Sequence, residues 1–124
     1  MTISRQNFED LGVPFGPYTH AVRHENTIFT SGFTAFGTQA QAASAEEQTH
    51  ATLSQLSFLA GQYGKTLSDL VKVTVFVTDP SDIPGIRHAL TEAYGKNVPA
   101  SSLVMVAGLF SPDLRVEMEA IFGL

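Results

Sequence analysis

Apolar and polar positions alternate most strictly in VKVTVFVTD, residues 71–79. Side chains at every second position of an extended strand share one face, so this stretch predicts a strand with one buried face. The predicted buried face carries Val71, Val73, Val75 and Val77. A similar pattern in VRHENTIFTSGF, residues 22–33, predicts two short strands around a polar turn at residues 24–26.

Helical spacing follows a polar, small-residue loop. Ser44 with Glu47 three positions later is a capping-box pattern, which predicts that a helix begins there. Its apolar positions recur at intervals of three and four residues, and Gly64 provides a natural end. The predicted core stripe is Leu53, Leu56, Ala60 and Tyr63.

A second helix is predicted after the turn at Asp79–Pro80, with Ser81 or Asp82 as its cap and Gly95 at its end. The core stripe of this helix is Ile83, Ile86, Leu90 and Ala93. NVPASS, residues 97–102, reads as a loop, and the strands SLVMVAGL (102–109) and RVEMEAIF (115–122) follow it.

The predicted order of elements is therefore strand, strand, helix, strand, helix, strand, strand, within a single domain over residues 1–124. This order indicates an α+β fold with a mixed sheet of five to six strands. Two helices cover only one face of such a sheet, so the other face must be solvated or buried against another copy of the chain. With 44% hydrophobic residues in the sequence, we favour an oligomer.

Composition narrows the range of partners and locations. The formal net charge is −5, and the seven basic residues are scattered along the chain, so nucleic acid is not an expected partner. The chain has no cysteine, which excludes disulfides and thiolate metal sites. No apolar run approaches the length of a membrane span, and the first residues lack the apolar core of a signal peptide. These features predict a cytoplasmic protein without membrane contact.

No general catalytic or cofactor-binding motif is present. The chain lacks a P-loop, a nucleophile elbow, a zinc-protease motif and a dinucleotide-binding fingerprint. His20 and His24 lie on a strand-turn segment where their spacing does not converge on a metal, and we expect surface or capping roles for them. His50 and His88 stand alone, one on each predicted helix. We therefore expect neither a metal nor a cofactor.

Three short stretches are candidates for a site. In FGPYTHAV, residues 15–22, Tyr18 is either packed at a strand edge with its hydroxyl in water or exposed to a pocket. In TSGF, Gly32 lies inside a strand, which indicates a bulge or a close approach to the backbone. Glu117 and Glu119 share one face of the last strand with Arg115, and they either keep a solvated face polar or line a pocket.

The motifs GPYTHAV, IFTSGF, LVKVTVFVTD, the VPA loop and RVEMEAIF occur in an order and at a spacing that resemble the Rid (YjgF-type) family of imine and enamine deaminases. Members of this family were once labelled L-PSP endoribonucleases. The resemblance extends from about Gly16 to Phe122. It implies a chorismate-mutase-like α+β fold, with both helices on one face of the sheet, and a homotrimer with a small-molecule ligand in the cleft at each subunit interface.

The resemblance also implies roles for individual residues. Glu117 matches a glutamate that positions or activates the water attacking the imine carbon, and Tyr18 matches an aromatic residue of the cleft. Ser31 and Gly32 match the strand that forms the cleft wall. The backbone near Leu103 matches the segment proposed to hold the water. By this resemblance the products are a 2-oxo acid and ammonia.

The chain differs from the family at the position of the residue that binds the substrate carboxylate. Ser101 stands where deaminating members have an arginine, whose planar guanidinium binds a carboxylate through two hydrogen bonds. Removing one partner of such a buried charge pair costs about 2–5 kcal/mol. Arg87 occupies a position near the cleft where many relatives have asparagine, and it either supplies the missing charge or is a surface arginine. Phe33 replaces a common glutamine, which makes the wall more apolar.

The sequence therefore leaves two functions open. One is a deaminase of the 2-iminobutanoate/2-iminopropanoate (imine/enamine) type with an altered cleft and a non-standard substrate, in which Glu117 handles water. Without the arginine, a desolvated Glu117 is expected to have a raised pKa. The other is a trimeric protein that binds a small metabolite or a partner protein without catalysis. RNA cleavage follows only from the old family label, and the acidic charge argues against it.

Overall fold

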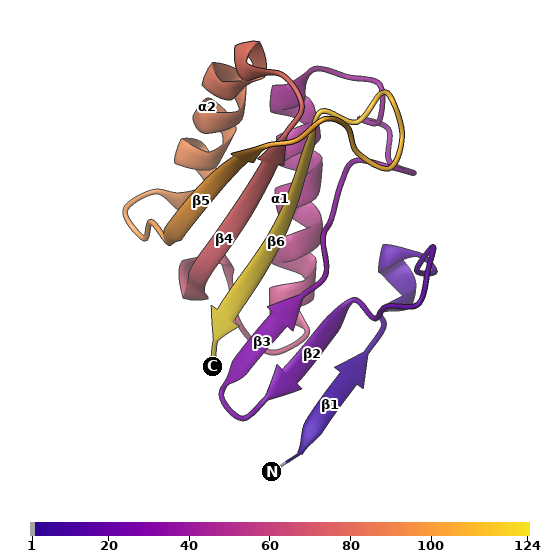
Figure 1. Ribbon diagram of the computed structural model, residues 1–124. Helices are drawn as coiled ribbons and strands as arrows, with labels where there is room; N and C mark the ends of the chain where they lie inside the picture. The colour runs from indigo at the N-terminus through magenta and orange to yellow at the C-terminus, as the bar shows by residue number, and fades with distance from the viewer. Residues whose placement is uncertain (1) are drawn as a thin grey trace.

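Six strands form one sheet in the order β1-β2-β3-β6-β4-β5 in a computed structural model of the protein, which describes residues 2–124 (Figure 1). The strands are β1 (Ile3–Gln6), β2 (Ala21–His24), β3 (Thr27–Thr30), β4 (Leu70–Val77), β5 (Ala100–Met105) and β6 (Val116–Gly123). The helices are α1 (Ala45–Gly61) and α2 (Ile83–Tyr94), and single 3-10 turns cover Glu9–Leu11, Leu67–Asp69 and Pro80–Asp82. Strands β4 and β5 are parallel and all other neighbours are antiparallel, so the predicted mixed sheet is confirmed.

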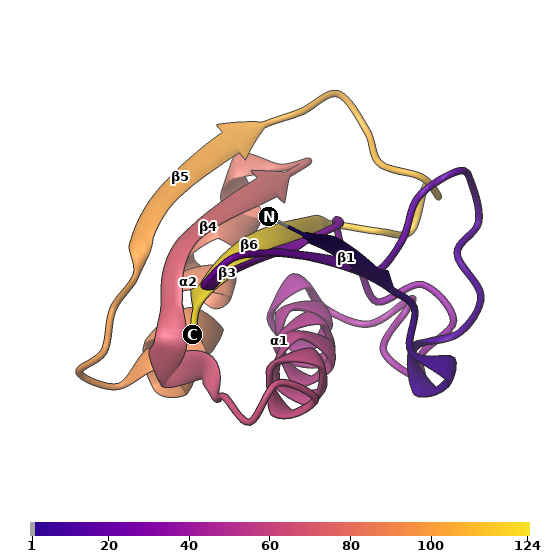
Figure 2. The ribbon, with the colours of Figure 1, turned by 90° about the horizontal axis from the view of Figure 1, so that it is seen from below.

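Both helices lie on the same side of the curved sheet, as Figure 2 shows in a view along the strands from below. The core between the helices and the sheet is apolar and fully buried at its centre. Its largest members come from β3, β4, β6 and both helices: Ile28, Leu56, Leu59, Val73, Val75, Val77, Ile86, Val116, Met118 and Phe122. The alternation in β4 and β6 therefore predicted the buried face of the sheet.

The local signals at Ser44 and Gly95 are confirmed, whereas α1 ends at Gly61, three residues before the predicted end at Gly64. The Ser44 side chain accepts a hydrogen bond from the Glu47 backbone N–H (3.2 Å), and α1 begins at the next residue. Gly95 ends α2 with a positive φ of 58°, a conformation that favours glycine. Asp82 precedes α2 but makes no side-chain hydrogen bond to its first turn. The turn between β2 and β3 lies at Glu25–Asn26, as predicted.

Three details differ from the sequence prediction. Strand β1 was missed because Ile3–Gln6 is exposed along its whole length and shows no apolar alternation. Val71 is 55% exposed, because the register between β4 and β6 shifts at Leu70/Lys72 and Leu70 takes the buried position instead. Ser101 and Ser102 belong to β5 rather than to a loop, since the parallel pairing with β4 begins at Ala100.

The sheet face that the helices leave uncovered is partly apolar. Phe29 and Val104 alternate along their strands with Ile28 and Leu103, which pack into the core, so they lie on the uncovered face, where they are 43% and 40% exposed. It also carries Lys72, whose amino group donates to the Ser102 hydroxyl (2.7 Å). A partly apolar open face is what the oligomer prediction required, and the homotrimer itself stays a prediction. Within residues 2–124 neither helix has the length and hydrophobicity needed to cross a membrane.

A buried glutamine joins α1 to the loop before β6. The Gln48 side chain is fully buried, and its amide donates to the carbonyl oxygens of Gln41 (3.0 Å), Ala43 (3.2 Å) and Asp113 (2.9 Å). Its carbonyl oxygen accepts from the Arg115 backbone N–H (2.8 Å). One side chain thus satisfies four backbone groups from two loops, which fixes the entry of the chain into β6.

Replacing this glutamine should therefore loosen the loops as well as weaken the fold. We predict that Gln48→Ala lowers the free energy of unfolding by about 3 kcal/mol, because it leaves buried backbone groups without partners. Gln39 is exposed, so Gln39→Ala serves as the control and should have little effect. Urea unfolding of the two variants measures the difference, and equal stabilities would contradict the structural role of Gln48.

Candidate functional site

A cleft of about 550 Å³ lies between the loop before β2, the segment after β3 and strand β6. Residues from five parts of the chain line it, including one residue of α1. They are Leu11, Val13, Pro14, Phe15, Gly16, Tyr18, His20, Ser31, Gly32, Phe33, Thr34, Phe36, Gln55, Phe110, Glu117 and Glu119. Five of the residues expected from the sequence are therefore brought together: Tyr18, Ser31, Gly32, Phe33 and Glu117.

The wall of the cleft is a β-bulge between β3 and β6. Phe29 pairs with Ile121 and Phe33 pairs with Met118, so residues 30–32 face only residues 119 and 120. The Thr30 hydroxyl accepts from the Ala120 backbone N–H (2.9 Å), which replaces one ladder hydrogen bond at the bulge. The glycine in the TSGF stretch thus marks both features that the sequence indicated, a bulge and a close approach to the backbone.

The group that approaches Gly32 is the carboxyl of Glu117. A Cβ atom added at Gly32 would lie 2.9 Å from Cδ of Glu117, closer than side-chain atoms pack. Burial raises the pKa of the Glu117 carboxyl above its ordinary value, and the negative charge of Glu119 raises it further. This is the direction expected from the sequence, and it stays a prediction until Glu117 is titrated. A carboxyl group with a raised pKa is a stronger base once it is ionised.

Tyr18 and Ser31 occupy the mouth and the wall of the cleft. The Tyr18 hydroxyl accepts a hydrogen bond from the Phe15 backbone N–H (3.2 Å), and its side chain remains exposed. The Ser31 hydroxyl donates to the Thr19 carbonyl oxygen (2.5 Å). The proton of Ser31 is therefore engaged within the protein, and its oxygen is left to accept a hydrogen bond from a ligand.

His20 belongs to the cleft, although the sequence suggested a surface or capping role for it. The imidazole is 3% exposed, and Nδ1 accepts from the Phe8 backbone N–H (2.9 Å). The ring also packs against Phe33, with centroids 5.8 Å apart. Burial lowers the pKa of His20, so the neutral form is favoured. Its local sequence carries no signal for this, because the partner Phe8 lies 12 residues earlier.

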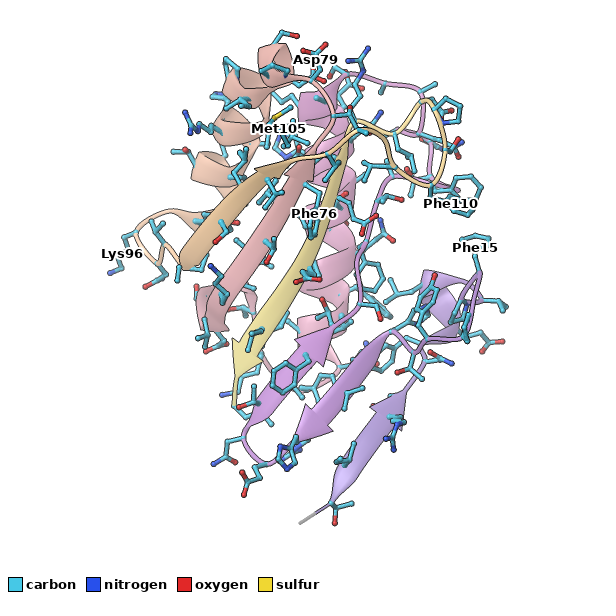
Figure 3. The ribbon with its side chains drawn as sticks, viewed as in Figure 1. Phe15, Phe76, Asp79, Lys96, Met105 and Phe110 are labelled. Carbon is cyan, nitrogen blue, oxygen red and sulfur yellow. The ribbon has the colours of Figure 1, made fainter. Side chains whose placement is uncertain are left out.

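Three phenylalanine side chains from separate loops meet at the rim of the cleft. The ring centroids of Phe36 lie 5.0 Å from Phe15 and 4.7 Å from Phe110, both edge to face. Phe15 and Phe110 stack with centroids 5.5 Å apart, and Figure 3 shows them pointing toward each other from opposite loops. Sequence reasoning missed this aromatic rim (Phe15, Phe36 and Phe110), because nothing local to each loop shows that the three loops adjoin.

Comparison with known proteins shows which family the chain belongs to. The Endoribonuclease L-PSP family matches residues 11–122, nearly the whole chain. The chain belongs to the Rid (YjgF-type) family. The sequence-based recognition of this family is thereby confirmed.

Individual Rid relatives match over most of their length. A RutC family protein of Pyrococcus abyssi is 32% identical over 111 residues, covering 87% of each chain. A 2-iminobutanoate/2-iminopropanoate deaminase of Dermatophagoides farinae is 30% identical, covering 87% of this chain and 86% of its own. The crystal structure of a YjgF/YER057c/UK114 family member from Mycobacterium tuberculosis superposes with a TM-score of 0.82 at 28% identity, covering 99% of this chain and 100% of the other.

The other three residues suggested by the Rid resemblance do not line the cleft of their own chain. Ser101 and Leu103 lie on β5, the edge strand that β4 separates from β6. Arg87 is an exposed residue of α2. A single chain therefore brings together five of the eight expected site residues. The roles of Arg87, Ser101 and Leu103 in the site stay predictions.

His50 and His88 do not stand alone, contrary to the expectation from the sequence. The fold brings α1 beside α2, so that His88 Nδ1 lies 2.7 Å from a Glu46 oxygen and 3.4 Å from a Glu92 oxygen. His50 Nε2 lies 3.8 Å from the same Glu92 oxygen. Ligand atoms of Glu46, His50 and Glu92 fall within 4.8 Å of one another, a spacing that could hold a divalent cation. All these side chains are solvent-accessible, and none of them lines the cleft.

The contact between Gly32 and Glu117 can be tested by adding a methyl group. We predict that Gly32→Ala displaces the Glu117 carboxyl from the wall while the free energy of unfolding changes by no more than about 1 kcal/mol, because the displaced group ends a flexible side chain. A crystal structure of the variant and urea unfolding measure the two effects. Gly61 has no atom within 4 Å of an added Cβ, so Gly61→Ala is the matched control. An unmoved Glu117 in Gly32→Ala would contradict the described packing.

Proposed function

We propose that the protein hydrolyses an imine or enamine to a carbonyl compound and ammonia, with Glu117 as the general base for water. The single observation that carries this proposal is a partly desolvated carboxyl with a raised pKa at the wall of a cleft large enough for a small molecule. Rid-family membership supports it, and the relative from Dermatophagoides farinae is named for the deamination of 2-iminobutanoate and 2-iminopropanoate.

The reaction moves both protons of the attacking water to the nitrogen. Glu117 takes the first proton as oxygen bonds to the imine carbon and gives it to the nitrogen of the addition product. It takes the second from the hydroxyl of that product as the C=O bond forms and the C–N bond breaks, and this proton converts the departing ammonia to NH₄⁺. For a protonated imine the balance is R₂C=NH₂⁺ + H₂O → R₂C=O + NH₄⁺. The neutral imidazole of His20 and the Tyr18 hydroxyl are further polar groups of the cleft lining.

We further infer that the cleft is completed by a second subunit of a homotrimer. The partly apolar open sheet face and the free edge of β5 support this arrangement, since both are surfaces that an oligomer buries. Ser101 and Leu103 would then reach the cleft of a neighbouring subunit, and the ligand would be held between two chains. Arg87 could contribute a charge to the site only in the same way, because it does not line the cleft of its own chain.

The substrate is not expected to be a small 2-imino acid. Ser101 supplies one hydrogen bond but no positive charge for a carboxylate, and the cleft is lined by phenylalanines and two acids. The same lining argues against RNA as a substrate, because a phosphate backbone would meet Glu117 and Glu119. We expect a larger, less acidic imine.

A trimeric binding protein without catalysis is the second candidate. The observation that favours it is the replacement of the expected arginine by Ser101, together with a Ser31 hydroxyl that donates within the protein. Such a protein would keep the cleft and its ligand but would not accelerate hydrolysis.

Ammonia release separates the two candidates. Imines generated in place by an amino-acid oxidase and by an amine oxidase should be hydrolysed faster than in buffer alone. We predict that Glu117→Gln reduces this acceleration by about a hundredfold or more, as expected for loss of a general base. Glu47 is exposed on α1, and Glu47→Gln is the control that should leave the rate unchanged.

Ser101→Arg provides the complementary variant. If the cleft is otherwise intact, restoring the arginine should raise the activity on 2-imino acids above that of the natural protein. No acceleration by the natural protein and none by Ser101→Arg, with any imine, would overturn the hydrolase proposal and favour the binding protein.

A further inference from the structure

The formally charged side chains that line the cleft are all acidic. Among residues 2–124, its lining includes the carboxylates of Glu117 and Glu119 and no lysine or arginine. The imidazole of His20 adds no positive charge, because Nδ1 accepts the hydrogen bond from Phe8 and burial favours the neutral ring. An anionic ligand would therefore enter a site whose only formal charges repel it.

The edge strand of a second subunit would not reverse this charge. The sequence of β5 is ASSLVM, which contains no charged residue. A neighbouring copy that offers Ser101 and Leu103 to the cleft contributes a hydroxyl group and an apolar side chain, while Lys72, which donates to the Ser102 hydroxyl (2.7 Å), lies on the other face of the sheet. If Lys72 and Arg87 of that copy stay outside the cleft, the positive charge that the site lacks comes with the ligand.

The aromatic rim favours a ligand that also carries an apolar group. Phe15 and Phe110 are 66% and 62% exposed, yet their rings are held in contact with each other and with Phe36. Large exposed apolar side chains are stabilised when a ligand covers them. The faces of aromatic rings also attract cations, more strongly when water is excluded. Aromatic rings at the mouth and carboxylates at the wall are together complementary to an organic cation with an apolar group.

We propose that the cleft is selective for iminium ions that carry an apolar or aromatic substituent and no carboxylate. This selectivity rests on the proposed hydrolase function and names its substrate class. The cationic nitrogen lies near Glu117 and Glu119, and the substituent packs against Phe15 and Phe110. Addition of water at the iminium carbon and loss of NH₄⁺ convert the ion to the aldehyde or ketone, with no other reactant needed.

Binding of a charge-reversed ligand pair tests the selectivity without requiring catalysis. Phenethylammonium and 3-phenylpropanoate have similar size and opposite charge, and isothermal titration calorimetry gives both dissociation constants. We expect the cation to bind at least about tenfold more tightly than the anion. Glu119→Gln should narrow this gap, and added salt should weaken binding of the cation.

Variants of the rim test the aromatic part. Phe110→Ala and Phe15→Ala should each weaken binding of phenethylammonium by about threefold to thirtyfold, the range expected for a lost packing contact between its phenyl ring and an aromatic side chain. Phe58 is a half-buried residue of α1, on the side of the sheet that the helices cover, and it does not line the cleft, so Phe58→Ala is the control. Circular dichroism of each variant confirms that the fold is retained.

The outcomes distinguish this selectivity from the hydrolase function. Tighter binding of the anion, or hydrolysis of 2-imino acids in preference to amine-derived imines, would overturn the selectivity and leave the hydrolase standing. Binding of the cation without hydrolysis of any imine would overturn the hydrolase and leave the charge preference. If neither ligand binds and Phe110→Ala dissociates an oligomer, another subunit covers the rim and the selectivity is wrong.

Discussion

The contact between the Glu117 carboxyl and the backbone of Gly32 is the constraint on which the site depends. A carboxyl group packed against a peptide backbone loses hydration, and this loss raises its pKa. The packing requires glycine, because any side chain at residue 32 would occupy the position of the carboxyl. It also requires the bulge between β3 and β6, where residues 30–32 lie opposite only residues 119 and 120. A regular ladder would pair these residues one to one. The chemistry of the cleft thus originates in an irregularity of the sheet.

Buried polar side chains hold the surrounding loops in place. Gln48 fixes the loop that carries Phe110, through the carbonyl of Asp113 and the N–H of Arg115. His20 fixes the N-terminal segment, through its bond from the Phe8 N–H. The loops can therefore carry exposed aromatic residues at the rim although they contain little regular structure. The cleft thus combines an acidic wall with an apolar rim, and the proposed selectivity for a cationic ligand rests on this combination.

Much of this architecture could be predicted from the sequence, and the failures have local causes. The alternation in β4 and β6 predicted the sheet and its buried face, and Ser44 and Gly95 marked helix ends correctly. Gly32 inside a strand indicated the bulge. Val71 was wrongly predicted to be buried, because a register shift between β4 and β6 reverses the alternation at the start of β4. The sequence of one strand does not reveal how that strand pairs with its neighbour. The places of His20 and Phe110 and the contacts of His50 and His88 with Glu92 were missed. Each place in the cleft depends on segments that are distant in sequence and meet only in the fold, and the contact of His50 with Glu92 depends on the packing of α1 against α2.

Direct titration of Glu117 tests the central claim, that its carboxyl is desolvated at the cleft wall and poised as a base. Carbon-detected NMR of the carboxyl resonances gives the pKa in the natural protein and in Glu119→Gln. We predict a pKa above the ordinary value of 4.5 in the natural protein, and a lower pKa in Glu119→Gln, because the variant removes a neighbouring negative charge. Because the folded state then holds its proton to higher pH than the unfolded state, the stability should fall as pH rises from the ordinary pKa through the raised one. An ordinary pKa for Glu117 that does not respond to Glu119→Gln would contradict the claim.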